Sequence, residues 1–160
     1  MFKLIAVALS AMSIAAWSVT ASAEESGHWK GKAVLIVTNQ PTVKVADQSD
    51  HQLMLTELDG IVFSEGEKPF LDNARYQVVD LNDSGGLVSG GYKTFTAGDG
   101  SKVFAQYKVT GGAPPTFNGE WKFVGGTQKY KGISGSGTFK ITWVSDTAAW
   151  DLLEGDYRLP

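Results

Sequence analysis

Two acidic residues are the first candidates for acid–base chemistry. Glu57 and Asp59 lie two positions apart in a predicted strand, residues 52–64. Alternate strand residues share a face and stand about 7 Å apart. The same face carries Leu53, Leu55, Ile61 and Phe63. If it lines an apolar interior, burial would favour a protonated carboxyl that serves as general acid or base. Alternatively, this face is outside the fold, or the two carboxylates form salt bridges at its rim.

Aromatic residues are the second candidate set, because they recur on one face of several predicted strands. If these residues form the wall of a pocket, they would bind an apolar or aromatic ligand, and the tyrosine hydroxyls would orient it. In the alternative interpretation they only fill the core of a small barrel. The candidate ligand-binding residues are Tyr76, Tyr92, Tyr107, Trp121, Phe139 and Trp143.

Other familiar sites find no support in the sequence. His28 and His51 are the only histidines, and the spacing of His51 from Asp47 and Asp50 matches no established metal site. There is no Gly-x-Ser-x-Gly nucleophile motif, no phosphate-binding P-loop and no cysteine. We therefore expect neither a metal nor a cofactor.

The positively charged side chains are expected outside, on the faces opposite the aromatic residues. This set comprises Arg75, Lys93, Lys102, Lys108, Lys122 and Lys140. We interpret it as a solvated exterior rather than a recognition patch.

The N-terminus has the features of a cleaved secretory signal peptide. A short basic start, an apolar stretch and the small-x-small sequence Ala21-Ser22-Ala23 predict cleavage after Ala23 and a periplasmic or secreted protein. Removal of Lys3 lowers the basic residues from 14 to 13 against 17 acidic ones, a net charge of −4. This balance argues against nucleic acid and anionic membranes as partners. A single domain, residues 24–160, is then expected.

The mature sequence predicts an all-β fold. Alternating apolar and polar residues, separated by glycine-rich turns, indicate antiparallel strands, and no long helical periodicity occurs. A closed eight-stranded barrel is favoured, because closure removes exposed edges and leaves room for side chains or one small ligand. The expected strands are 29–38, 42–46, 52–64, 71–81, 87–96, 102–110, 120–124 and 138–144, with a last strand or a short helix and strand in 150–160.

Residues 119–143 organise this prediction. Two alternating segments, 120–124 and 138–144, flank a glycine-rich run that is typical of a β corner. The run resembles a stretch of allene oxide cyclase-like and dirigent-like barrels, with Gln128 where that pattern usually has glycine. The matching positions are Gly125, Gly126, Thr127, Tyr130, Gly132, Gly135 and Gly137.

The resemblance implies a calycin-like eight-stranded antiparallel barrel, here in a bacterial exported member, and a possible homo-oligomer, a trimer in those families. It assigns no catalytic residue, since the matched positions shape a corner. Two hypotheses follow. The first is a barrel that binds a small hydrophobic molecule without catalysis. The second is a cyclase or isomerase with Glu57 as acid–base group and a tyrosine as orienting donor, which folds its substrate away from water.

Overall fold

The computed structural model describes residues 24–66, 70–86 and 89–160. The expected signal peptide, residues 1–23, lies outside the described residues. Within them, strands and one short 3-10 helix, η1 (Gln128–Tyr130), follow one another along the chain. The strands are β1 (Glu25–Asn39), β2 (Thr42–Lys44), β3 (Gln52–Ser64), β4 (Ala74–Asp83), β5 (Ser89–Thr96), β6 (Lys102–Ala113), β7 (Thr116–Gly126), β8 (Ser134–Ser145) and β9 (Ala148–Leu159).

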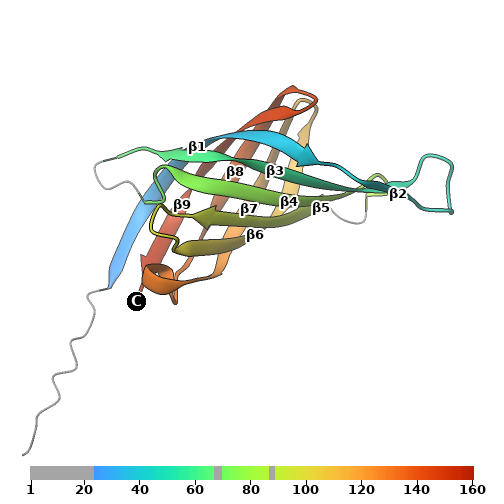
Figure 1. The fold of residues 1–160 in the computed structure, drawn as a ribbon. Coiled ribbons are helices and arrows are strands. Elements are labelled where there is room, and N and C mark those ends of the chain that lie inside the picture. Colours follow the sequence, from blue (N-terminus) through green and yellow to red (C-terminus); the bar gives the residue numbers. More distant parts are fainter. Residues whose placement is uncertain (1–23, 67–69, 87–88) are drawn as a thin grey trace, which may run out of the picture.

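The described strands form one antiparallel sheet that closes on itself (Figure 1). Each strand from β3 to β9 pairs with its neighbour in the chain, and β1 pairs with both β9 and β3. The short β2 adds only to the beginning of β3. The result is the eight-stranded antiparallel barrel that the sequence predicts, and the C-terminal segment is a strand throughout most of its length.

The interior of the barrel is packed differently at its two ends. At the end near η1 the interior is packed with aromatic rings, and Tyr130 of η1 contacts Phe70 there. The Trp29 indole makes edge-to-face contacts with Phe95 and Trp121, at centroid distances of 5.5 and 5.8 Å. Phe70, from the β3–β4 connection, stacks on Tyr157 at 4.0 Å. Burying such rings supplies a large share of the hydrophobic stabilisation of a small domain.

Inward-facing glycines make room for these rings. A Cβ atom on Gly137 would lie 2.6 Å from Cζ2 of Trp121, and one on Gly155 would lie 2.7 Å from the same atom. The two glycines face each other across the β8–β9 pair. Part of the glycine-rich pattern therefore accommodates a tryptophan inside the barrel, in addition to the turn between β7 and β8.

Helices contribute little to this structure. Among the described residues, no helix has the length and apolar character needed to cross a membrane.

Candidate functional site

The half of the barrel opposite η1 is hollow. A cavity of about 600 Å³ lies there, bordered by the beginning of β3 and by the ends of β4, β6 and β8. The β2 hairpin extends from the same end (Figure 1). A volume of this size suits a small organic molecule. The apolar part of its wall consists of Met54, Leu58, Val78, Val109, Phe117, Phe139, Ile141 and Trp143.

A buried charged cluster lies where the hollow half meets the packed half. Lys93 of β5 and Asp151 of β9 both line the cavity, and their side chains are 2% and 0% exposed. The Lys93 ammonium donates to Oδ2 of Asp151 at 2.6 Å and to the Tyr76 hydroxyl at 2.5 Å. The Tyr76 hydroxyl in turn donates to the same Oδ2 at 2.6 Å. These three groups form a closed triangle of hydrogen bonds, the cavity floor.

One oxygen of this floor lacks a partner. Oδ1 of Asp151 is buried, and no described residue donates a hydrogen bond to it. Leaving a buried acceptor unsatisfied costs about 1–3 kcal/mol. Asp151 is also one of the residues that border the cavity.

A second polar pair lies on the cavity wall. The Tyr107 hydroxyl donates to Oδ1 of Asp80 at 2.5 Å. Burial raises the pKa of Asp80, and the hydrogen bond from Tyr107 opposes that rise. Burial also raises the pKa of Tyr107, so its hydroxyl stays protonated. The wall thus holds a phenol whose one proton is donated to Asp80, and a carboxyl group that takes up a proton more readily than an exposed one.

Aromatic rings surround the Lys93 ammonium. Nζ lies 4.3 Å from the Phe139 ring centroid, 4.8 Å from that of Tyr107 and 5.3 Å from that of Tyr76. Burial lowers the pKa of Lys93, although Asp151 opposes this by favouring the charged form. Burial likewise raises the pKa of Tyr76 well above its usual value. The cation is therefore held by one carboxylate and several π faces in a nearly water-free place.

Comparison with known proteins adds information about the fold. No protein-family model matches the sequence, and no curated protein matches it. The structure is similar to that of GePTS1, described as a pterocarpan synthase dirigent protein, with a TM-score of 0.52 and 15% sequence identity. The match covers 92% of this chain and 96% of that one. This chain has a dirigent-like barrel fold. The family resemblance of residues 119–143 is confirmed at the level of fold.

Five of the six predicted aromatic residues lie inside this dirigent-like barrel. Tyr107, Phe139 and Trp143 line the cavity. Tyr76 belongs to the floor beneath it. Trp121 is buried in the packed half, where its indole lies 4.6 Å from the Phe123 ring.

The sixth aromatic residue, Tyr92, was expected inside and is not there. Its side chain is 58% exposed on the outer face of the barrel, whereas its neighbour Lys93 points inward. The expected outward position of Lys93 is therefore also wrong. The two errors share one cause, because neighbouring strand residues point to opposite faces, so an inward Tyr92 implies an outward Lys93.

Glu57 and Asp59 lie on the outer face of β3, so the inward placement on which their acid–base role depended is wrong. Met54, Thr56, Leu58 and Val62 point inward instead. Asp59 forms a bidentate ion pair with Arg75, with N–O distances of 3.0 and 2.5 Å. Oε1 of Glu57 accepts a hydrogen bond from Asn39 at 3.3 Å. Of the alternatives that the sequence left open, the outward orientation of this face is the one observed, and only Asp59 of the two acids is ion-paired.

Sequence reasoning did not select Asp80 or Asp151. Asp80 shares its inward face with Tyr76 and Val78 in β4. Asp151 likewise shares its inward face with Ala149 and Leu153 in β9. This alternation was a signal that could have placed both carboxylates inside.

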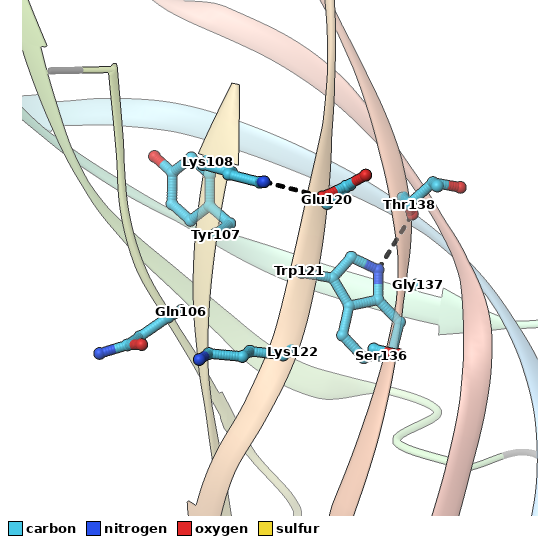
Figure 2. A pocket seen from close by; sticks show the side chains of 9 residues that line it. All are labelled: Gln106, Tyr107, Lys108, Glu120, Trp121, Lys122, Ser136, Gly137 and Thr138. Carbon is cyan, nitrogen blue, oxygen red and sulfur yellow. Dashed lines mark hydrogen bonds and ion pairs between the residues drawn. The ribbon is translucent and has the colours of Figure 1, made fainter. Parts of the chain in front are cut away.

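An outer groove of similar size crosses β6, β7 and β8 (Figure 2). Its lining includes exposed polar side chains such as Lys122, and Lys108 and Glu120 form an ion pair across it at 3.1 Å. The Trp121 indole N–H, which borders the groove, already donates to the backbone carbonyl of Thr138 at 3.0 Å. It contains no buried charged group, so the interior cavity is the stronger candidate site.

Proposed function

We propose that this barrel binds a small, mainly apolar ligand in its hollow half. The supporting observation is the buried carboxylate of Asp151, a residue that borders an apolar cavity and whose Oδ1 has no donor among the described residues. A ligand with an apolar body and one hydrogen-bond donor fits this arrangement. The body contacts the aliphatic and aromatic wall, and the donor reaches Oδ1.

Native mass spectrometry of protein purified from its own source tests this proposal without a guess about ligand identity. We expect a co-purifying small molecule that is released on unfolding. In parallel, titration with 2-naphthol, an aromatic body with one hydroxyl, reports binding through tryptophan fluorescence, since Trp143 lies in the wall.

Two variants locate the binding. Ile141→Trp fills part of the cavity, and we expect it to weaken 2-naphthol binding at least about tenfold, a loss of about 1.4 kcal/mol. Val144→Trp lies on the outer face of the same strand and is the matched control. If both variants bind 2-naphthol like the wild type, the cavity is not the site.

A second function, cyclase or isomerase, is favoured by the two carboxyl groups of the cavity. Asp80 has a pKa raised by burial, whereas Asp151 is paired with a lysine. Carboxyls in such different surroundings can divide the roles of acid and base. In this proposal Asp80 donates a proton while the cavity wall holds the substrate folded.

The first substrate class to assay is suggested by the fold neighbour, a pterocarpan synthase, namely the precursors of pterocarpans. If turnover is found, Asp80→Asn should abolish it, and Glu57→Gln should leave it unchanged because Glu57 lies outside. Loss of turnover in Glu57→Gln instead would contradict this assignment.

We also propose that the chain acts after export. The support is the N-terminal sequence pattern described above. Edman sequencing or intact mass of the protein recovered from periplasm or medium should show Glu24 as the first residue. A chain that keeps Met1 or begins elsewhere would contradict cleavage after Ala23.

A further inference from the structure

Lys93 differs from every other lysine that the structure describes, because it alone is buried inside the barrel. Its amine lies at the cavity, between an acidic partner and aromatic rings. An ammonium has three N–H groups. Two of them are used by Asp151 and the Tyr76 hydroxyl, so one direction is left for the rings and the cavity.

We propose that Lys93 captures the carbonyl group of an apolar aldehyde or ketone as an imine. The inference rests on the proposed function, since it names a ligand class for the same cavity. A lysine amine in an apolar pocket is a nucleophile toward carbonyl carbon.

The neighbouring groups can carry every proton that this step moves. Lys93 first gives one ammonium proton to Asp151, and the free amine forms an N–C bond to the carbonyl carbon. A second proton passes from nitrogen to the former carbonyl oxygen, which gives a carbinolamine. Asp151 then returns its proton to that hydroxyl, the C–O bond breaks and water leaves. One ammonium and one carbonyl compound yield one iminium and one water, without any oxidant or reductant.

The surroundings favour both the free amine and the product. Burial lowers the pKa of Lys93, which increases the fraction of neutral amine. After water leaves, the iminium occupies the position of the ammonium, with Asp151 as counterion and the Phe139 ring 4.3 Å from the nitrogen. An apolar wall excludes the water that would hydrolyse the imine.

Reductive trapping tests this chemistry on the whole mature protein. The probe is 2-naphthaldehyde with sodium cyanoborohydride, which converts an imine into a stable secondary amine. Intact mass gives the number of adducts, and peptide mapping gives their positions. We expect one dominant adduct at Lys93, formed at least about tenfold faster than at exposed lysines such as Lys122 or Lys140, because the cavity holds the aldehyde next to the amine.

The comparison among lysines of the wild-type chain needs no variant. Protein unfolded in urea is the reference, in which Lys93 should lose its advantage. Lys93→Arg keeps the positive charge and should eliminate the dominant adduct, whereas Lys122→Arg, on the outer face of β7, should retain it. Addition of 2-naphthalenemethanol, which lacks the carbonyl, should slow trapping by competition.

The outcomes separate this inference from the proposed function. If 2-naphthaldehyde quenches tryptophan fluorescence but Lys93 is labelled no faster than exposed lysines, the cavity binds ligands and imine formation is refuted. If neither 2-naphthol nor 2-naphthaldehyde binds and no selective adduct forms, both ideas fail. Labelling confined to exposed lysines likewise refutes capture by Lys93.

Discussion

Lys93→Met should be among the most destabilising single substitutions in this barrel. The side chain of Lys93 is 2% exposed and that of Asp151 is 0% exposed. Removing the ammonium leaves a buried carboxylate whose Oδ2 keeps only the Tyr76 donor and whose Oδ1 has none among the described residues. Breaking a buried ion pair in this way costs about 3–5 kcal/mol. Domains of this size are stable by only about 5–15 kcal/mol.

The assay is urea unfolding followed by circular dichroism, with the free energy of unfolding taken from linear extrapolation. Lys108→Met is the matched control. It also breaks a lysine–carboxylate pair, with Glu120 at 3.1 Å, but both side chains are more than half exposed. Such a surface pair contributes at most about 1 kcal/mol.

A triple variant distinguishes the cost of leaving a buried carboxylate without its partner from the effect of removing the whole polar cluster. Lys93→Met, Asp151→Leu and Tyr76→Phe together remove the whole floor triangle and leave no polar group of that triangle without a partner. Apolar replacement of a buried ionic cluster is often neutral or stabilising by about 1–4 kcal/mol. The triple variant should therefore be more stable than Lys93→Met alone. If Lys93→Met costs less than about 1 kcal/mol, or if the triple variant is the least stable, the cluster is not held in a dry interior.

Three further predictions concern other parts of the barrel. Gly137→Ala should destabilise by about 1–3 kcal/mol or more in the same urea assay, because its Cβ would lie 2.0 Å from the backbone oxygen of Glu154 and 2.6 Å from Trp121, whereas Gly98→Ala, with open space around it, should be neutral. Hydrogen bonds that His51 donates to the carboxylates of Asp47 and Asp83 raise its pKa above 6.5, so its stabilising contribution is complete below pH 6.5 and is lost as pH rises through the folded-state pKa. Unfolding of His51→Gln at pH 6 and pH 8 should lack this part of the pH dependence, and an unchanged difference would contradict it. Asp59→Asn should leave 2-naphthol affinity within about twofold, since the side chain is outside.

The sequence predicted the barrel because its strands alternate clearly and its turns are rich in glycine. It also predicted which face of β4, β6, β7 and β8 is buried, from apolar residues that recur at every second position, such as Ala74, Tyr76 and Val78 in β4. In β6, for example, Val103, Ala105 and Tyr107 all point inward. In such strands the hydrophobic pattern determines the face.

The same reasoning failed where the pattern conflicts with itself. In β5 the aromatic residues Tyr92 and Phe95 have opposite parity, so both cannot be inside. The structure selects Phe95, whose ring stacks on Tyr76 at 4.6 Å and meets Trp29 edge-on. That choice turns Lys93 inward, against the general preference of lysine for the surface.

In β3 both faces are apolar, and alternation alone cannot distinguish them. Ile61 and Phe63, each 48% exposed, face outward together with Glu57 and Asp59. The partner of Lys93 is 58 residues further along the chain, in a strand on the other side of the barrel. Such a pair becomes visible only when the register of all intervening strands is known.

The position of the charged floor suggests a division of tasks within one barrel. Aromatic packing near η1 supplies stability through ring contacts such as Trp29 with Trp121. The Lys93–Asp151 pair contributes little to that purpose, because apolar residues of similar volume would be about as stable or more so. A costly buried cluster at the boundary with a cavity is therefore better explained by ligand chemistry than by folding. The triple apolar variant makes this distinction measurable, since it should stay folded and lose both 2-naphthol binding and aldehyde capture.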